Sequence, residues 1–551
     1  MNKKIKVGLA LFSATFLLAA CGGNKADTKK ENNSKGEVEQ VARLGIPQEV
    51  ASIDPANATD LVSFGVINQI NEGIYRLDET NKPTAAGAKE LATVSDDGLE
   101  YTIKLREDAK WSNGDPVVAD DYVYAWQRAV DPSTGSEYAY LFENIQNGTE
   151  IIEGEKKPTE LGIEAVNDYE LKITLANATP YFDYLLAFPT FYPMNKKAVE
   201  EFGKDYANSS DKTVYNGPFV LTNFDGPGSD VDWTYEKNPD YWDKDNVKME
   251  KIEAQVVKEA STALNLYEDD QLDDVIISGE LAQQYREDAD FVGVPDGRTI
   301  YLEMNREKKN KHFDNLNLRK ALSYAVDGEA IVNNVLGDGS KTVSGIVPKG
   351  LSSNPKTGKD FVEDSGKYKE FDEKKAKEYF EKAKKELNID TLSFEILTDD
   401  NDSTKKIAEY IQGAYKDVLG IETDVAVVTK PIRLDRTTAG DFDMVVTGWG
   451  ADYNDVSSFL DLFVTGNSYN KGKYSNPKYD KLIEESRTTN ATNLEARWRN
   501  HLDAEKVLLG EDYAVIPLYQ VVEGHLINPK IKGYVRHTAG APYDYKYMSV
   551  E

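Results

Sequence analysis

Alternating apolar and polar positions mark short strands in the first third of the chain. In residues 101–105, Tyr, Ile and Leu occupy every second position, and residues 171–175 repeat the pattern with Leu, Ile and Leu. Successive side chains of a strand point to opposite faces, so this spacing predicts two half-buried strands.

Further along the chain, apolar residues recur at the spacing of a helix. Residues 316–326 and 371–387 carry apolar side chains three and four positions apart, which predicts two amphipathic helices. After them, apolar runs that predict strands alternate with a further predicted helix, in the order 394–397, 404–419 (helix), 423–428 and 442–447. This succession is typical of an α/β fold.

The amino terminus has the pattern of a lipoprotein signal. A short basic patch precedes an apolar run, residues 7–20, that is too short for a comfortable bilayer span. The run ends in Leu-Ala-Ala and Cys21 follows directly, an arrangement that resembles a bacterial lipobox. We expect a signal peptide over residues 1–20 and a lipid on Cys21. An ordinary signal peptide followed by a chance cysteine is the alternative.

Residues 21–40 predict a flexible tether. Between Gly22 and Gln40, Val38 is the one aliphatic side chain larger than alanine, and so polar a segment cannot bury enough surface to fold. As a coil it would reach about 20–25 Å, enough to hold a domain away from a membrane surface. Ordered structure is expected to begin near Val41.

The length, charge and composition of the chain limit the folds and functions that it can have. Residues 41–551 are too many for one hydrophobic core, so two or three lobes are expected. The formal net charge of −30 argues against nucleic acid or an anionic membrane as the bound surface. Cys21 is the sole cysteine, so no intramolecular disulfide can form. The 32 Tyr and 6 Trp fit a protein that binds through aromatic rings, and equally one that fills a large core with them.

A search for catalytic or metal-binding motifs finds none. Zinc-protease, serine-hydrolase and phosphate-loop patterns are missing, and the four histidines lack ligand spacing: His312, His501, His525 and His537. We expect no enzymatic activity, metal or cofactor. A membrane-anchored hydrolase whose active site leaves no local pattern stays open as an alternative.

A series of short stretches follows the order found in one protein family. They are 53–55, 71–75, 97–106, 111–121, 216–219, 237–242, 318–327, 448–453 and 458–460, which together extend over nearly all of the mature chain. Any one of them could arise by chance. The ordered set resembles the solute-binding proteins of the peptide/nickel family, bacterial family 5.

The resemblance implies an α/β fold of the periplasmic-binding-protein type, a three-lobed Venus flytrap with an extra domain. Lobe I is expected to be discontinuous, over residues 41–71, 206–300 and 525–551. Lobe II would span residues 72–205 and lobe III residues 301–524. Two strands would link lobes I and III as a hinge, and the ligand would be enclosed between these lobes on closure.

The function that the resemblance implies is capture of oligopeptides and their delivery to the membrane permease subunits of an ABC importer. We expect a monomer, lipid-anchored on the outer face of the cell membrane, with no nucleic-acid partner. A surface receptor for one signalling peptide is the alternative, because it would use the same fold and site. The segment 451–453 resembles the oligopeptide branch of the family, which disfavours nickel or haem as the ligand.

The peptide site of the family can be carried over onto one segment of this chain. Asp452 matches the aspartate that pairs with the α-ammonium group of the ligand. Gly448, Trp449 and Gly450 match the segment whose backbone lies beside the peptide, and the ring of Trp449 would form part of the wall of a side-chain pocket. Without the surrounding motif, Asp452 would be interpreted as a solvated loop residue.

Further site residues follow from the same resemblance. Ala451 and Tyr453 flank the aspartate and are expected to contact the peptide. Thr59, Asp60 and Leu61 align with a lobe I strand that faces this segment.

The carboxylate end of the ligand has no matching anchor. Some members clamp short peptides with an arginine three residues before the tryptophan, and Val446 occupies that position here. Lys430 or Pro431 stands where an aromatic residue is expected. Lys430, Arg433 and Arg436 are therefore candidate partners for a ligand carboxylate, in a site that is looser or longer than in those members.

Overall fold

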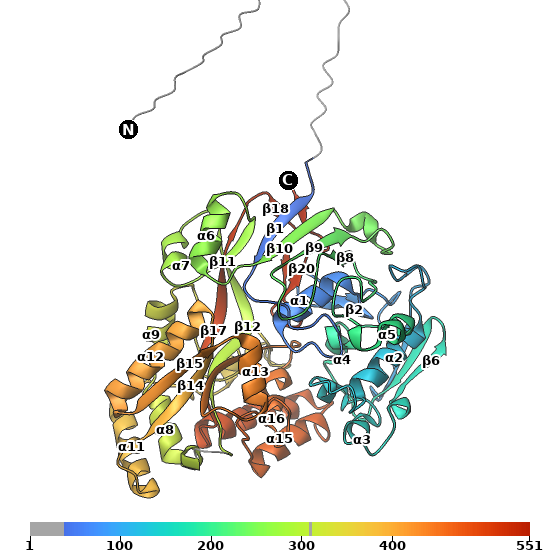
Figure 1. Ribbon diagram of the computed structural model, residues 1–551. Helices are drawn as coiled ribbons and strands as arrows, with labels where there is room; N and C mark the ends of the chain where they lie inside the picture. The colour runs from blue at the N-terminus through green and yellow to red at the C-terminus, as the bar shows by residue number, and fades with distance from the viewer. Residues whose placement is uncertain (1–37, 308–310) are drawn as a thin grey trace, which may run out of the picture. The chain divides into compact units, whose positions relative to one another are not determined.

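A mixed β-sheet organises the chain that the computed structural model describes, residues 38–307 and 311–551 (Figure 1). Among these residues it has eleven strands, with β13 (Lys341–Thr342) pairing beside β17. The other strands, from edge to edge, are β15 (Glu422–Val428), β14 (Ser393–Asp399), β16 (Met444–Gly450), β12 (Phe291–Met304), β17 (Val515–Ile527), β11 (Asp274–Ile277), β1 (Val41–Ile46), β10 (Lys251–Val256), β9 (Asp232–Lys237) and β8 (Phe219–Thr222). Helices alternate with these strands along the chain, so the predicted α/β class is confirmed.

Gln40–Glu551 form one compact unit, and all of the structure discussed below belongs to it. The expected signal peptide and Cys21 lie outside the described residues. The first described strand begins at Val41, where ordered structure was expected. Within residues 38–307 and 311–551, none of the helices combines the length and the apolar character that a membrane span requires.

Two long strands run through the middle of the sheet. β12 and β17 have 14 and 13 residues and pair with each other in antiparallel fashion. At one end β12 also pairs with β16, and at the other end β17 pairs with β11. The two strands cross positions 300 and 524, where boundaries between lobes I and III were expected. The division into lobes itself stays a prediction.

Helices pack on the β14–β15 end of the sheet. α12 (Asp402–Leu419) lies against both strands. Together with α8 (Leu316–Tyr324) and α11 (Glu373–Leu387), it contributes to one apolar cluster. All three helices were predicted from their apolar spacing, and their ends differ from the predicted ones by no more than two residues. The other helices of eight residues or more in the described chain are α1 (Leu61–Ile70), α2 (Ala119–Val130), α6 (Ala260–Glu268), α13 (Lys430–Thr438), α15 (Pro477–Arg487) and α16 (Leu494–Glu505).

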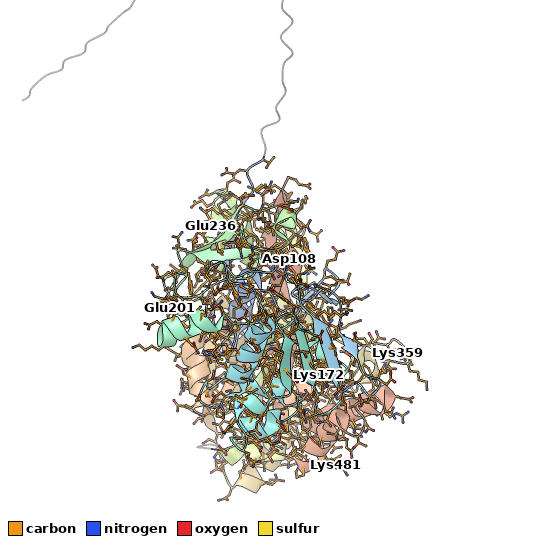
Figure 2. All side chains as sticks on the ribbon, turned by 90° about the vertical axis from the view of Figure 1, so that its right-hand side faces the viewer. Asp108, Lys172, Glu201, Glu236, Lys359 and Lys481 are labelled. Carbon is orange, nitrogen blue, oxygen red and sulfur yellow. The ribbon has the colours of Figure 1, made fainter. Side chains whose placement is uncertain are left out.

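A second sheet is built within residues 72–205. Its order is β4 (Thr93–Val94), β5 (Glu100–Lys104), β7 (Glu170–Thr174) and β6 (Ile163–Asn167). The middle strands β5 and β7 are those predicted from alternation, and they bury Tyr101 and Ile103, and Leu171 and Ile173. Charged side chains of this region, such as Lys172, project from the surface (Figure 2).

The last segment of the chain returns to the first described strand. The side chain of Gln40 donates to the carbonyl of Val550 at 2.9 Å and accepts from its N–H at 3.0 Å. A buried ion pair between Arg76 and Asp544 holds the segment around Asp544 against the residues after α1. These contacts place residues 40–76 beside the carboxyl end of the chain.

The prediction that Thr59, Asp60 and Leu61 belong to a strand is wrong. Asp60 is the N-cap of α1, because its carboxylate accepts from the backbone N–H groups of Val62 and Ser63. These bonds satisfy amides that the first helical turn leaves without partners, so the chain turns into a helix at Leu61.

Candidate functional site

A cavity of about 200 Å³ lies along β16 and β12, next to the beginning of α1. Strand β16 and the residues after it supply one part of its wall, and the loop before α1 supplies another. Most of the expected site residues reach this cavity: Thr59, Asp60, Leu61, Gly448, Trp449, Gly450 and Asp452. Two segments far apart in the sequence are thus brought to one place.

Asp452 is a buried carboxylate without a cation. It is 4 % exposed and accepts hydrogen bonds from the hydroxyl groups of Tyr138 at 3.1 Å and Tyr140 at 3.4 Å. Burial raises the pKa of Asp452 to about 8, and the two tyrosine hydrogen bonds offset this only in part. Among the described residues, none places a positive charge within ion-pair distance of the carboxylate. A cationic group that entered the cavity would meet an acceptor that lacks a counter-charge.

One backbone edge of β16 is unpaired beside the cavity. On one side β16 pairs with β12 along its whole length, residues 444–450. On the other side β14 pairs only with Met444 and Val445, and no further strand of the described chain extends that ladder. The polar backbone groups of residues 446–450 on this side can therefore pair with an added extended chain.

Two glycines of β16 allow close packing with the neighbouring walls of the cavity. A Cβ on Gly448 would collide with the side chain of Ile300, and a Cβ on Gly450 would lie 3.0 Å from a methyl carbon of Leu61. Side chains at these positions would push into the neighbouring walls. The close approach explains why glycine stands on both sides of Trp449.

Trp449 forms an aromatic wall next to Asp452. Its ring stacks on Tyr138 with centroids 6.4 Å apart and meets the edge of Tyr469 at 4.7 Å. The indole Nε1 is buried and has no hydrogen-bond partner within the described residues. A buried donor without a partner is costly, so a ligand acceptor at this place would be stabilising.

Lys430 and Asp60 form an ion pair on the wall of the cavity. The Nζ atom of Lys430 lies 3.5 Å from Oδ1 of Asp60, whose side chain is 3 % exposed. The pair joins the beginning of α13 to the beginning of α1. Lys430 thus has an acidic partner before any ligand binds.

The other candidate carboxylate partners are also engaged. Arg433 lines the cavity and holds Asp399 through Nε at 2.8 Å. Arg436 is not on the cavity wall and pairs with Glu395 at 2.6 Å. Val446 does line the cavity, at the position where some family members carry a clamping arginine.

Ala451 and Tyr453 are placed behind the wall. The backbone N–H of Ala451 donates to the carbonyl of Gly297 at 2.9 Å, which fixes the turn after β16. The ring of Tyr453 stacks on Tyr181 at 4.4 Å and does not line the cavity. Both residues position Asp452 and lie away from the cavity surface.

The two tyrosines that hold Asp452 were not predicted from the sequence. Tyr138 and Tyr140 belong to a short 3₁₀ segment and its preceding residue within residues 72–205, far from Asp452 in the chain. No local pattern in the sequence links them to an acid more than 300 residues away. For metals, no group of three or more His, Cys, Asp or Glu side chains in the described part of the chain is arranged to hold an ion.

Comparisons with known proteins give a consistent result. The family model for bacterial extracellular solute-binding proteins, family 5 (middle), matches residues 82–471. A dipeptide-binding protein of Lactococcus lactis is 36 % identical over 99 % of this chain and 98 % of its own length.

Solved structures show the same likeness in three dimensions. A structure of Listeria monocytogenes OppA bound to peptide superposes with a TM-score of 0.88 and 42 % identity, over 93 % of this chain and 99 % of that one. A structure of the pheromone receptor PrgZ, described with its mode of peptide binding, gives a TM-score of 0.89 and 42 % identity, over 93 % and 100 %.

Proposed function

This chain belongs to the bacterial extracellular solute-binding proteins of family 5, and we propose that it captures oligopeptides outside the cytoplasm and delivers them to the permease subunits of an ABC importer. One observation carries the proposal: the buried carboxylate of Asp452, which has no cationic partner among the described residues, lies at the end of the unpaired backbone edge of β16. A peptide offers the two matching features, an α-ammonium group and an extended backbone.

The chemistry of this site suits ligands of many sequences. An ammonium group on Asp452 forms a charge-assisted hydrogen bond, and backbone pairing along residues 446–450 ignores side-chain identity. Both contacts use features that all peptides with a free amino terminus share. Side chains would then enter the cavity beside Trp449, where they can contact its ring and the nearby walls.

We propose binding without a chemical reaction. Members of this family are solute-binding proteins, and relatives are named for the dipeptides and oligopeptides that they bind. In this proposal Asp452 serves as a counter-charge and neither a nucleophile nor a cofactor is involved.

The route to the membrane is part of the same proposal. The lipobox-like sequence before Cys21 and the polar residues 22–40 support a lipid-anchored monomer that stands off the membrane on a tether. In a Cys21→Ser variant, processing and membrane retention are expected to be lost, as measured by fractionation of cells. A variant processed and retained like the wild type would overturn the anchoring proposal.

A receptor for one signalling peptide is the second candidate. The observation that favours it is the 42 % identity to the pheromone receptor PrgZ. Native mass spectrometry of the protein purified from its own cells separates the two functions. Peptides of mixed mass support import, one dominant peptide supports a receptor, and a protein that never carries peptide contradicts both.

A further inference from the structure

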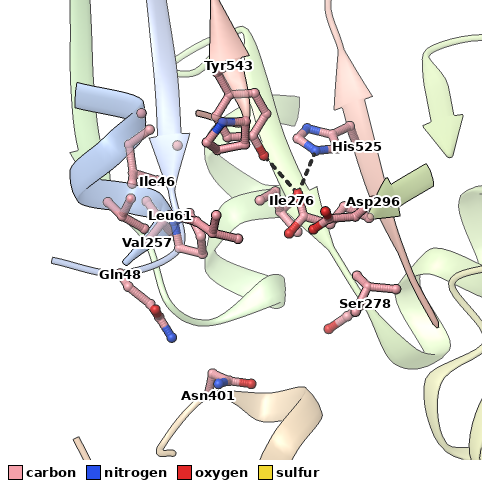
Figure 3. A pocket seen from close by; sticks show the side chains of 18 of the residues that line it. Ile46, Gln48, Leu61, Val257, Ile276, Ser278, Asp296, Asn401, His525 and Tyr543 are labelled. Carbon is pink, nitrogen blue, oxygen red and sulfur yellow. Dashed lines mark hydrogen bonds and ion pairs between the residues drawn. The ribbon is translucent and has the colours of Figure 1, made fainter. Parts of the chain in front are cut away.

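A second cavity has a volume of about 240 Å³, and Figure 3 shows side chains that line it. The two share several wall residues, among them Gln48, Leu61, Arg298, Ile300, Asn401 and Lys430. β12 supplies Arg298 and Ile300 to both walls, so the cavities follow one another across the sheet, the first above β16 and the second above β17 and β11. A ligand backbone in the first cavity could therefore send a side chain into this second cavity, which we call the side chamber.

The side chamber has an apolar side and a charged side. Ile46, Leu61 and Val257 come from the region around β1 and α1, whereas Asp296 and His525 come from the long strands β12 and β17 (Figure 3). A ligand group that suits both sides must have an apolar stem and a polar tip.

Arg298 is shared between two carboxylates on the charged side. Its Nη2 donates to Glu523 at 2.6 Å, and its Nε lies 3.1 Å from Oδ2 of Asp296, without the geometry of a hydrogen bond. Glu523 has a second donor in the hydroxyl of Tyr543 at 2.8 Å. One guanidinium thus faces two acids, and Glu523 holds it more closely.

Asp296 is left with unused acceptors. Its side chain is 15 % exposed, and its carboxylate oxygens accept no hydrogen bond from the described residues. Burial raises the pKa of Asp296 to about 6; Arg298 lowers it, and the charge of Glu523 raises it further. The carboxylate would be better satisfied with a second cation next to it.

The other basic side chains of the side chamber have acidic partners of their own. Lys430 is paired with Asp60, and Lys258 lies 3.0 Å from Glu49 and 3.6 Å from Asp400. The ring of His525 lies 2.8 Å from Asp274 and 3.6 Å from Glu523. An incoming carboxylate would find these cations and Arg298 already neutralised, and it would face Asp296 and Glu523. An incoming cation would find Asp296 available.

We propose that the side chamber selects a lysine or arginine side chain of the bound peptide, with its stem against Leu61 and Ile276 and its charged tip on Asp296. This inference rests on the proposed peptide-binding function. Lysine and arginine have the required form, because a flexible hydrocarbon stem ends in a group with several donors. Asp296 is then a specificity-determining residue, separate from the anchor at Asp452.

Calorimetry with a scanned peptide set tests the inference. The probes are alanine-based heptapeptides with a free amino terminus, in which lysine, norleucine or Nε-acetyl-lysine is moved through positions two to seven. At one position we expect lysine to bind the wild type about tenfold or more tightly than norleucine or acetyl-lysine, as for a hydrogen bond to a charged group. In Asp296→Asn this ratio should fall to about one, while the dissociation constant of the norleucine peptide changes less than about twofold.

Glu495→Gln is the control. Glu495 is an exposed carboxylate that pairs with Lys356 and Arg499, away from the wall of the side chamber, so this variant should keep the preference for lysine. Binding of all peptides by the wild type without preference at any position overturns the inference and leaves the proposed function intact. A preference that persists in Asp296→Asn also overturns it. If no peptide binds, the proposed function fails and this inference with it.

Discussion

Asp452 and Asp455 lie three residues apart, and both are buried, yet their surroundings differ in one respect. Asp455 is held by Arg497 through two hydrogen bonds, at 2.7 and 2.6 Å, and the guanidinium in turn lies over the ring of Tyr181. Within the described part of the chain, the carboxylate of Asp452 accepts hydrogen bonds only from the hydroxyl groups of Tyr138 and Tyr140. Burial works to raise the pKa of both carboxyl groups, but Arg497 brings the pKa of Asp455 below its ordinary value, whereas that of Asp452 rises to about 8.

The difference separates a structural acid from a binding acid. Asp455 carries its counter-charge within the chain and holds α16 beside the segment after β16. Asp452 depends on a group from outside for the same charge balance. A buried charge is tolerated where it is paired, so the missing cation at Asp452 indicates a place for a ligand cation.

The largest effect is expected from breaking the structural pair. In Arg497→Ala, Asp455 would be left as an uncompensated buried charge, which lowers the free energy of unfolding by about 3–5 kcal/mol. Arg499→Ala is the matched control in the same helix, because Arg499 is exposed and pairs with Glu495 at the surface; it should cost about 0–1 kcal/mol. Urea unfolding followed by circular dichroism measures both, and equal losses in the two variants would remove the contrast.

A second effect, which depends on pH, is expected at Asp452 in the peptide-free protein. The carboxyl group of Asp452 binds a proton more tightly in the folded state than in the unfolded state, so its protonation stabilises the fold. This stabilisation is present below about pH 4 and is lost as the pH rises through about 8. Asp452→Asn does not titrate. The free energy of unfolding of Asp452→Asn, relative to that of the wild type, should therefore increase from pH 4 to pH 8, by an amount on the order of a few kcal/mol.

The stabilisation from Asp455 depends on pH in the opposite direction, and Asp455 is present in both proteins that are compared. Its lowered pKa means that its contribution is present above the ordinary carboxyl range and is lost as the pH falls through the folded-state value. Thermal unfolding between pH 4 and pH 8 records the difference between wild type and Asp452→Asn. A difference independent of pH would contradict the assigned environment of Asp452.

The smallest effect is expected at the other end of the peptide. Arg433 and Lys430 are both paired with acids, and Val446 offers no charge, so a ligand carboxylate finds little to bind. Free-acid and amide forms of peptides of five to nine residues should differ by less than about threefold in dissociation constant, whereas a charge-assisted clamp would contribute about 1.5–3 kcal/mol. A drop of tenfold or more on amidation at every length would reveal a clamp, with Arg433 as the first residue to replace.

Local patterns were sufficient to predict much of the fold. The apolar stripe of α11 and the alternation in β5 and β7 are properties of a few neighbouring residues, and each predicted its element closely. The strand expected at Thr59–Leu61 failed because alignment to a family outweighed a local signal. Asp60 directly before an apolar run is typical of a helix N-cap, and its carboxylate does cap α1.

The candidate site was predictable where it follows one strand. Gly448, Trp449, Gly450 and Asp452 are close in the sequence and line one cavity. Its environment was not predictable, since Tyr138 and Tyr140 reach Asp452 only through tertiary packing. The absence of a cation near Asp452 is likewise a property of the folded chain, and no spacing in the sequence encodes it.

The central claim is that Asp452 binds the amino-terminal ammonium group of a peptide, and a double-mutant cycle by calorimetry tests it most directly. Wild type and Asp452→Ala are titrated with one peptide in its free-amine and N-acetylated forms. Removing either partner should weaken binding by about 2–5 kcal/mol, roughly 30-fold to several thousand-fold, and removing both should cost little more than removing one. Dissociation constants that stay unchanged on acetylation and in Asp452→Ala would contradict the claim.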